Sequence, residues 1–567
     1  MALEIRSNTG SWKADRWIAA GLFVVSAACL LAFRRYTSMD PDEGIVLQGA
    51  QRILHGEVLY RDFFSFLTPG SYYLLAAVFK IFGGSFLVAR TILVLYGALF
   101  TIFTYAMARR TCSRSSSLFA AYLTAATCLP WRFMVLHNWD STLCTCLSVY
   151  FAVLFMQSPG KTRAFALGSS LCLTFLFEQS KGAGLALGLL LGFVLVALVR
   201  PARPQFTRRR ACALLAGCAW PLVLTLACFG SHHALRPLLS DWLWPLRHYS
   251  AANRVPYGYA DWSDQARQNL FHSGSRFQTF VAFLAVSPCF ILPALPLIAV
   301  LLLVQWLAPA RRSAVAPDQE SHCVILASTM SGLLLSVLAT RANIIHFVYL
   351  APIFYVTLAW ILDGAGLSSR FLCAARPVIA LLISVTFSAT TMSLWIENRN
   401  ARWMLATRRG AVRTVARDDL IPYVQAHVAP GERIFVYPYF PLAYYLTATF
   451  NATSFEYLQP GMHTREQSER ALKQLEAAKP RVVVYEITFY DKIPASWPNT
   501  PPQALAADVL GDYILSHYHS CAILASASQS RFSFMAQDGI SCPVDVAQSH
   551  ALQEGSTDSH RAVPTTE

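Results

Sequence analysis

The sequence predicts an α-helical polytopic membrane protein with a small α/β domain at its C-terminal end. Of its 567 residues, 55% are hydrophobic and only 14% are charged, whereas about a quarter of the residues of a soluble domain are charged. The mean hydropathy is +0.41. Long apolar runs recur through residues 1–397, and strand-like runs replace them afterwards. These features favour an integral membrane protein with about 11 transmembrane helices.

The basic residues lie mostly in short loops between apolar runs. The net charge is +14, and pairs such as Arg109-Arg110 and the run Arg208–Arg210 follow or precede apolar segments. This is the distribution of the positive-inside rule, so we expect membrane lipids and no nucleic acid as partners. The basic residues before the first span, Lys13 and Arg16 among them, predict a cytoplasmic N-terminus in an inner or plasma membrane.

The spans follow in order along the chain. The first, Trp17 to Phe33, precedes Arg34-Arg35, a poor cleavage context, so we interpret it as an uncleaved helix rather than a signal peptide. An odd number of spans places the tail on the same side as Asp42. The other predicted spans are 86–108, 118–129, 143–155, 165–177, 182–199, 211–229, 280–307, 324–338, 347–362 and 378–395.

Two long loops are predicted on the side of the membrane away from the cytoplasm. Residues 34–86 form the first, with a short amphipathic helix over Ile45–Leu54 that lies in the membrane interface. The apolar piece Tyr72–Phe82 is too short to cross comfortably, and a true span there is the competing interpretation. Residues 231–278 form the second long external loop, which is polar and aromatic.

The tail differs in kind from the rest of the chain. Strand-like runs at 432–438 and 481–486 flank a helical stretch at 464–476, which predicts an extracytoplasmic α/β domain over residues 398–547. Cys521 and Cys542 can form a disulfide if this domain is extracytoplasmic. Residues 548–567 are polar and lack aromatic residues, so we expect them to be disordered.

Ionisable residues from several external loops are predicted to meet on one face. Each has a plain structural explanation: solvated loop charge, helix-terminal charge, interfacial anchor or hydrogen-bonded packing residue. Convergence from four or five separate loops favours a site instead. The residues are Asp40, Asp42, Glu43, Asp140, Glu178, Lys181, Arg341 and His346.

Such a set suits transfer from an anionic lipid donor. Lys181 and Arg341 can bind phosphate oxygens. A carboxylate such as Asp42 can take the proton of an acceptor hydroxyl that attacks an anomeric carbon, while the lipid phosphate leaves. No cofactor is implied. A divalent metal beside Asp42 and Glu43 is compatible with the sequence, but no ligand spacing requires one, so we predict no metal site.

The residues Pro41-Asp42-Glu43, His55-Gly56-Glu57, Leu59–Asp62 and Pro69-Gly70 resemble the first external loop of GT-C glycosyltransferases. The nearest branch is that of the bacterial relatives of protein O-mannosyltransferases and lipid A aminoarabinose transferase. The resemblance implies a polyprenyl-phosphate sugar donor. It also implies roles for particular residues: Asp42, Glu43 and Asp140 as catalytic residues, and Lys181, Arg341 and His346 as donor-phosphate contacts.

The sequence therefore predicts a GT-C type membrane glycosyltransferase. We expect it to move a single sugar from a polyprenyl phosphate to a lipid, glycan or protein acceptor on the extracytoplasmic side, with Asp42 as general base. The alternative is a transporter or flippase of lipid-linked sugars, but transporters place charges near the middle of the membrane. Here the spans are nearly free of charge.

Overall fold

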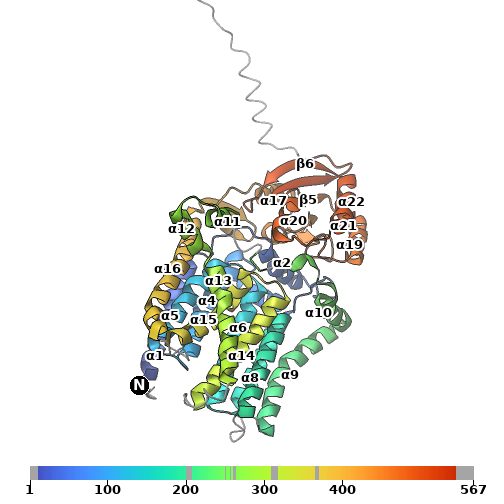
Figure 1. The fold of residues 1–567 in the computed structure, drawn as a ribbon. Helices are drawn as coiled ribbons and strands as arrows, with labels where there is room; N and C mark the ends of the chain where they lie inside the picture. Colours follow the sequence, from blue (N-terminus) through green and yellow to red (C-terminus); the bar gives the residue numbers. More distant parts are fainter. Residues whose placement is uncertain are drawn as a thin grey trace, which may run out of the picture.

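The computed structural model describes residues 11–199, 207–249, 251–255, 257–258, 264–307, 317–363 and 370–543. It has two parts: a bundle of long helices, and an α/β domain that sits on one end of the bundle (Figure 1). The N-terminal end of α1 (Ser11–Leu31) lies at the opposite end of the bundle from this domain. The segment predicted to be disordered, 548–567, lies outside the described residues.

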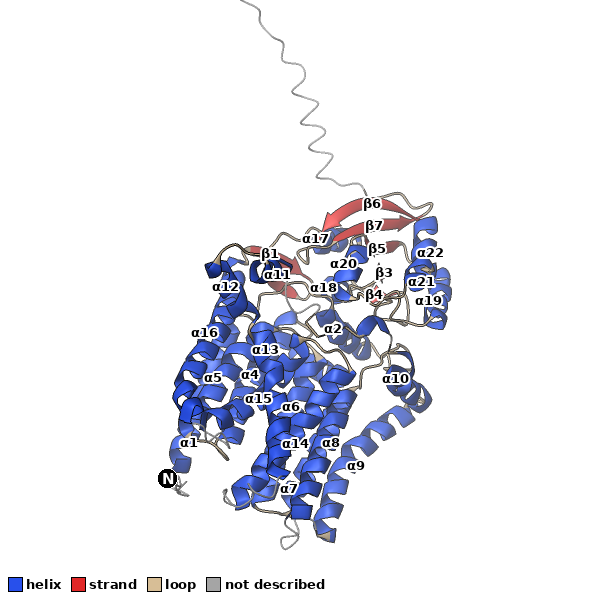
Figure 2. Cartoon of the chain, in the orientation of Figure 1, coloured by secondary structure: helices blue, strands red, loops and turns tan. Residues whose placement is uncertain are grey.

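Helices of membrane-spanning length dominate the bundle. Among the described residues, nine helices are long and apolar enough to cross a membrane. The shorter helices α5 (Arg114–Trp131) and α7 (Lys161–Phe177) pack among them (Figure 2). The polytopic fold is thus confirmed, while the count of about 11 spans stays a prediction. Besides α1, the nine are α4 (Phe86–Ala108), α6 (His137–Gln157), α8 (Gln179–Val199), α9 (Arg208–Ser231), α13 (Pro288–Leu307), α14 (Pro317–Ala339), α15 (Ile344–Asp363) and α16 (Arg370–Asn400).

One predicted span is wrong in its first part. Residues 280–307 do not form a single helix, because α12 (Arg276–Val286) ends just before α13 begins at Pro288. A proline lacks the backbone N–H that would continue the hydrogen bonds of a helix, but it suits the first position of a new one. The span is therefore confined to α13.

The first long loop forms two short helices at the end of the bundle that faces the α/β domain. The amphipathic helix α2 (Asp42–Leu54) begins three residues earlier than predicted, at Asp42 itself. The helix α3 (Gly70–Phe82) has 13 residues, which gives a length of roughly 20 Å against a hydrocarbon core of about 30 Å. The second long loop carries α10 (Leu235–His248), the short turn Ala251–Asn253 and α11 (Asp264–Phe271).

The C-terminal part contains a five-stranded sheet with the strand order β4-β3-β5-β7-β6. β3 is parallel to both β4 and β5, whereas β7 is antiparallel to its neighbours β5 and β6. The predicted strands and the intervening helix are present, and a disulfide joins Cys521 to Cys542. The strands are β3 (Arg433–Tyr437), β4 (Phe450–Asn451), β5 (Val482–Glu486), β6 (Tyr518–Ala525) and β7 (Arg531–Gln537), preceded by the hairpin β1 (Trp403–Thr407) and β2 (Gly410–Thr414).

Helices surround this sheet and form the rest of the domain. The predicted helical stretch is α19 (Arg465–Ala478), which begins with a capping box at Thr464. The other helices are α17 (Leu420–His427), α18 (Leu442–Thr447), α20 (Phe489–Ser496), α21 (Pro502–Ala506) and α22 (Val509–His517).

The domain is fastened to the first long loop. α18 packs on α2 at Gly44, where an added Cβ would lie 2.0 Å from the backbone nitrogen of Leu442. The backbone N–H of Phe64 donates to the carbonyl of Ser454 over 2.9 Å. Only a glycine permits this approach of α18. The contact holds the start of α2 directly beneath the domain.

Candidate functional site

Asp42 lies in the first turn of α2, where side chains of the bundle and of the C-terminal domain meet. The hydroxyl of Tyr439 donates a hydrogen bond to its carboxylate, and Arg132 Nη2 lies 3.2 Å from its Oδ2. Its side chain is still 44% exposed. Burial in the surrounding protein raises the pKa of Asp42, and repulsion by Asp40 raises it further, against the opposing effect of Arg132. A carboxylate that is both accessible and more basic than usual is suited to accept a proton.

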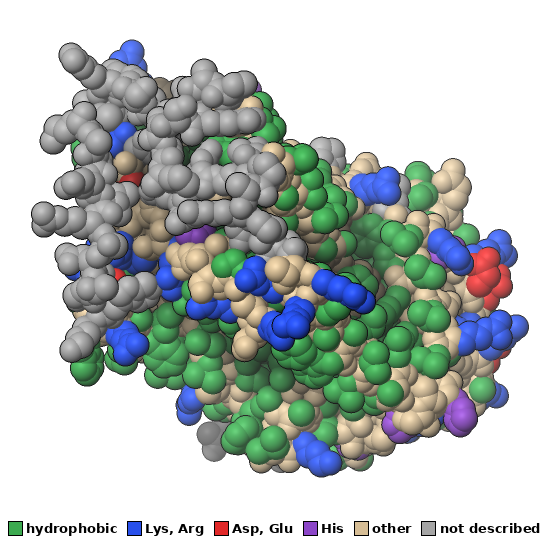
Figure 3. Space-filling model, turned by 90° about the horizontal axis from the view of Figure 1, so that it is seen from below, with side chains coloured by type: hydrophobic (Ala, Val, Ile, Leu, Met, Phe, Trp, Pro, Cys, Tyr) green, Lys and Arg blue, Asp and Glu red, His purple; other side chains and the backbone are tan. Residues whose placement is uncertain are grey.

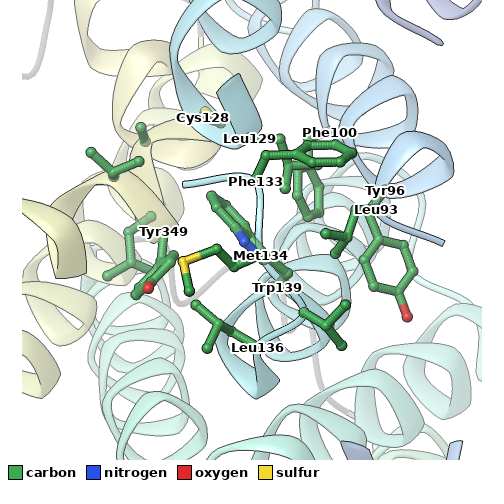
Figure 4. Packing of buried hydrophobic residues seen from close by; sticks show 14 of the residues in the cluster. Leu93, Tyr96, Phe100, Cys128, Leu129, Phe133, Met134, Leu136, Trp139 and Tyr349 are labelled. Atoms are coloured by element: carbon green, nitrogen blue, oxygen red, sulfur yellow. The ribbon is translucent and has the colours of Figure 1, made fainter. Parts of the chain in front are cut away.

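Arg132 forms ion pairs with both Asp40 and Asp42. Its Nη1 lies 3.0 Å from Asp40 Oδ2, and its buried Nε has no hydrogen-bond partner among the described residues. The segment that follows, 133–136, is buried in the bundle around Trp139 (Figure 4). The Trp139 indole N–H donates to the carbonyl of Arg132 over 3.1 Å. Packing therefore fixes the guanidinium beside Asp40 and Asp42, with its Nε unpaired among the described residues.

Glu43, the neighbour of Asp42, is fully buried in an ion pair. Arg90 donates to its carboxylate through Nε at 2.7 Å and Nη2 at 2.5 Å. The backbone N–H of Val135 donates to it over 3.0 Å. This carboxylate ties α2 to α4 and to the segment after Arg132, and these contacts already occupy both of its oxygens.

Asp140 belongs to a different network. It lies in the first turn of α6, where the hydroxyl of Tyr96 donates to its Oδ1 over 2.7 Å. Ser71 and Lys181 also interact with it. The partners of Asp42 are Arg132, Tyr439 and Arg341 instead. Asp42 and Asp140, two of the three carboxylates predicted to be catalytic, are therefore held by separate sets of residues.

Lys181 is enclosed by acceptors at the start of α8. Its side chain is 3% exposed, and its Nζ lies 2.9 Å from Glu178 Oε2. An ammonium group has three N–H donors, and four acceptors surround this one, so it presents no free donor in this conformation. The other three acceptors are Ser141 Oγ at 2.7 Å, Asn138 O at 3.0 Å and Thr142 Oγ1 at 3.2 Å.

Arg341 lies in the loop before α15, and His346 lies in the first turn of that helix. Arg341 Nη2 donates to the carbonyl of Ser496 over 2.7 Å, and its buried Nε has no hydrogen-bond partner among the described residues. Arg341 interacts electrostatically with Asp42 and with His346. His346 Nδ1 lies 2.6 Å from Asn343 Oδ1. The structure thus brings Arg341 close to both predicted groups, the acidic residues and the phosphate contacts.

Two residues that contact Asp42 were not predicted as site residues, namely Arg132 and Tyr439. Arg132 follows the apolar run of α5, so a charged side chain at the external end of a span was a signal that the sequence offered. Tyr439 is 397 residues from Asp42 along the chain and follows β3. No local pattern distinguishes it from the other tyrosines of the tail.

Comparison with known proteins agrees with this architecture. Residues 67–229 match the family model described as dolichyl-phosphate-mannose-protein mannosyltransferase. Comparison with curated protein sequences gives no match.

Solved structures match over most of the chain. The apo structure of ArnT from Cupriavidus metallidurans is 14% identical with a TM-score of 0.51, covering 93% of this chain and 98% of that one. The structure of the same protein bound to undecaprenyl phosphate is 13% identical with a TM-score of 0.49, covering 93% of this chain and 98% of that one. The structure of the oligosaccharyltransferase AglB from Archaeoglobus fulgidus in complex with an inhibitory peptide and a dolichol-phosphate is 13% identical with a TM-score of 0.47. The match covers 94% of this chain and 75% of that one. The likeness to the apo structure shows that this chain shares its fold.

Proposed function

We propose that this chain, which has the fold of the GT-C membrane glycosyltransferases, transfers a single sugar from a polyprenyl-phosphate donor to an acceptor on the extracytoplasmic side. The observation that carries the proposal is the position of Asp42. Its accessible carboxylate lies at the end of the bundle, beside Arg132 and Arg341 and beneath the C-terminal domain. The matched family, described as dolichyl-phosphate-mannose-protein mannosyltransferase, supports the donor class.

In the proposed reaction, Asp42 accepts the proton of an acceptor hydroxyl as its oxygen forms a bond to the anomeric carbon. The bond from that carbon to the phosphate oxygen breaks, and the polyprenyl phosphate keeps the electron pair and gains one negative charge. Nearby cations stabilise a charge that develops in the transition state. The raised pKa of Asp42 makes it a better base than an ordinary carboxylate.

We propose Arg341 and Arg132 as the cations that bind the donor phosphate. Each has a buried Nε without a partner among the described residues, and both interact with Asp42. The predicted contact His346 interacts electrostatically with both Lys181 and Arg341. Lys181 would have to exchange an existing partner to reach a phosphate. We therefore assign Lys181 a positioning role, in which it orients the segment at the start of α6 through Asn138, Ser141 and Thr142.

Glu43 and Asp140 take supporting roles in this proposal. Glu43 sets the position of α2 through Arg90, so it acts on the reaction through the placement of Asp42. Asp140 is the second candidate for the base, because it is only partly buried and keeps one oxygen outside the Tyr96 hydrogen bond.

The proposed orientation follows from charge. Figure 3 views the molecule from the end of the bundle opposite the C-terminal domain, and there Lys and Arg side chains predominate over Asp and Glu. Arg109, Arg110, Lys161 and the run Arg208–Arg210 lie at helix ends. By the positive-inside rule, this charge supports the proposal that this end faces the cytoplasm and that the C-terminal domain and Asp42 lie on the other side of an inner or plasma membrane.

The proposal is tested by comparing the wild-type protein with Asp42→Asn in membranes supplied with radiolabelled polyprenyl-phosphate sugars. We expect the wild type to transfer label to endogenous acceptors and Asp42→Asn, at equal expression, to lose this transfer. The surface substitution Glu469→Gln is the control and keeps full activity. Transfer that survives in Asp42→Asn moves the base to Asp140, and Asp140→Asn then abolishes it.

The alternative of a flippase is decided in the same preparation. Movement of lipid-linked sugar across vesicles that depends on the protein, without transfer to any acceptor, would overturn the transferase proposal. The absence of a metal requirement also stays a prediction. We expect transfer to persist after dialysis against EDTA, with restoration by Mg²⁺ or Mn²⁺ as the contrary result.

A further inference from the structure

A small cavity lies between α2, the segment 64–67 and the C-terminal domain. It is lined by Ile45, the segment Phe64–Leu67, Glu456, Tyr457 and His463. Its volume is about 10 Å³, room for about one water-sized group. The lining is mostly apolar and aromatic, with two ionisable side chains. Polar groups placed among apolar ones in this way can fix the orientation of a single small group that enters the cavity.

Glu456 carries an unused acceptor in this cavity. Its side chain is 5% exposed, and the hydroxyl of Tyr72 donates to Oε2 over 3.1 Å. The other oxygen, Oε1, is buried without a partner among the described residues. A buried acceptor without a donor costs stability, so the fold retains Glu456 at a cost. Burial raises the pKa of Glu456 to about 8, which favours an uncharged ligand over an anion.

His463 supplies the matching donor. The backbone N–H of Gln459 donates to its Nδ1 over 3.2 Å, so Nε2 carries the ring proton. Burial lowers the pKa of His463 to about 4, and the ring is neutral at physiological pH. Because the pKa of Glu456 is about 8, its carboxyl group is mostly protonated near pH 7, and the cavity offers this neutral carboxyl group together with the His463 N–H. A hydroxyl group, which can both donate and accept, can form a hydrogen bond with each of them.

Aromatic rings surround this pair. Phe66 stacks on Trp244 with ring centroids 5.4 Å apart, and His463 makes edge contacts with Phe64 at 6.1 Å and with Tyr457 at 5.1 Å. These rings pack against one another and enclose the polar groups in apolar carbon, so the cavity admits one small polar group and not a whole sugar ring. A single charged or purely apolar ligand would leave one kind of contact unmet.

The cavity adjoins the proposed catalytic base. Asp42, Ile45 and Gly49 lie on one face of α2 at i, i+3 and i+7. Ile45 lines the cavity, and an added Cβ at Gly49 would lie 2.7 Å from Glu456 Oε1. Tyr457 packs edge-on against Tyr439 at 4.6 Å, and Tyr439 donates to Asp42. The cavity and Asp42 are therefore connected through one face of α2 and through the Tyr457–Tyr439 contact.

We propose that this cavity is an acceptor subsite, in which Glu456 and His463 bind one hydroxyl group of a carbohydrate acceptor while a second hydroxyl faces Asp42. This rests on the transferase function proposed above and names its acceptor class: a glycan or the sugar headgroup of a glycolipid. A protein acceptor would offer a single hydroxyl and would leave the pair in the cavity unmatched.

The test measures transfer from the radiolabelled polyprenyl-phosphate sugar to methyl β-D-glucoside, methyl β-D-galactoside and methyl α-D-mannoside, followed by the monodeoxy analogues of the best acceptor. The protein is held in lipid nanodiscs free of glycoside detergents. We expect one deoxy analogue to lose roughly tenfold in kcat/KM with the wild type, the loss of one hydrogen bond in a buried site. Glu456→Leu should raise KM for the parent glycoside by a similar factor and make no distinction between the parent and that analogue.

Two further variants separate binding from a general loss of structure. His463→Phe keeps an aromatic ring but removes the donor, and it should lose the same discrimination at the same hydroxyl. Asp418→Asn alters a buried carboxylate of the same domain whose oxygens are bonded to Ile421, Ser526 and Ala527. It should lower the melting temperature without a selective change in KM for the glycosides. Equal discrimination in the wild type, Glu456→Leu and His463→Phe would overturn the subsite and leave a structural water as the occupant.

Saturation-transfer NMR with the same glycosides separates this inference from the transferase proposal. Binding to the wild type that is lost in Glu456→Leu, with no sugar transferred to any acceptor, would keep the carbohydrate site and overturn the transferase. Transfer to a serine- and threonine-containing peptide, with no glycoside bound or glycosylated, would keep the transferase and overturn the carbohydrate subsite.

Discussion

The hydroxyl of Tyr439, in the C-terminal domain, donates a hydrogen bond to the carboxylate of Asp42 in the first turn of α2. The site is therefore shared between the bundle and the domain. Gly44, two residues after Asp42, is in close contact with Leu442 of α18 and holds the two elements together. Because the domain contributes a side chain that touches the proposed base, we infer that it forms part of the proposed catalytic site.

The first prediction concerns the basicity of Asp42. The Tyr439 hydrogen bond stabilises the carboxylate and lowers its pKa, so Tyr439→Phe should raise that pKa further. A general base works only when deprotonated, so the rise of kcat/KM with pH should occur at higher pH in the variant. The measurement is the pH dependence of kcat/KM. Tyr518→Phe is the control, since the buried Tyr518 hydroxyl has no hydrogen-bond partner among the described residues. An unshifted profile in Tyr439→Phe would remove Asp42 from the role of base.

A second prediction separates structure from chemistry at Glu43. Arg90→Met leaves the Glu43 carboxylate buried and unpaired, and breaking a buried ion pair of this kind costs about 3–5 kcal/mol. We expect a clear fall in the melting temperature, and the double variant Glu43→Leu/Arg90→Leu should recover part of it. Glu469→Gln, in an exposed pair with Arg465, should cost less than about 1 kcal/mol. If Glu43→Gln abolishes transfer without lowering the melting temperature, Glu43 acts in the chemistry.

The third prediction compares two cations that the sequence assigned to the same role. Arg341→Gln should raise KM for the polyprenyl-phosphate donor at least tenfold, because a charge-assisted hydrogen bond to phosphate is lost. Lys181→Met should instead lower the melting temperature, since Glu178 then stays buried without its partner. Donor KM and thermal unfolding are measured on both variants. A selective rise of donor KM in a stable Lys181→Met protein would restore Lys181 as a phosphate contact.

The fourth prediction tests the orientation of the chain. In Cys521→Ser the disulfide is absent and Cys542 becomes a free thiol. If the domain is extracytoplasmic, a membrane-impermeant maleimide should label this variant in intact cells and leave the wild-type pair unlabelled. Cys212, exposed beside Arg208–Arg210, is the internal comparison and should react only after the membrane is permeabilised. Labelling of Cys542 only after permeabilisation would reverse the proposed topology.

Local sequence signals predicted more of the fold than of the candidate site. Apolar runs and their flanking arginines placed the spans, because a membrane-spanning helix must be long and apolar by itself. The acidic run at the start of α2 pointed to Asp42 for the same local reason. Whether a charged side chain is accessible or buried in an ion pair depends on partners far away in the sequence. Asp42 and Glu43 are adjacent in the sequence. Glu43 is buried in an ion pair with Arg90, whereas the Asp42 side chain remains partly exposed. Tyr439 reaches Asp42 only through the docking of a separate domain.

The last prediction concerns the pH dependence of stability at Glu456. Its pKa is about 8 in the fold against an ordinary value of 4.5, because burial disfavours the charged form. The folded protein therefore holds a proton that the unfolded chain releases. The stability that Glu456 contributes is fully present below pH 4.5, is lost progressively as the pH rises to about 8, and is constant above that.

Glu456→Gln cannot release this proton, so its melting temperature should rise relative to the wild type between pH 5 and pH 8 and keep a constant difference above pH 8. The comparison of the two proteins is needed because burial also raises the pKa of Asp241, to about 7, and so adds the same trend to both. Melting curves in nanodiscs across this range supply the measurement. A difference that does not vary with pH would mean that the Glu456 carboxyl is ionised in the fold, and a cationic group of the acceptor would then fit the cavity better than a hydroxyl.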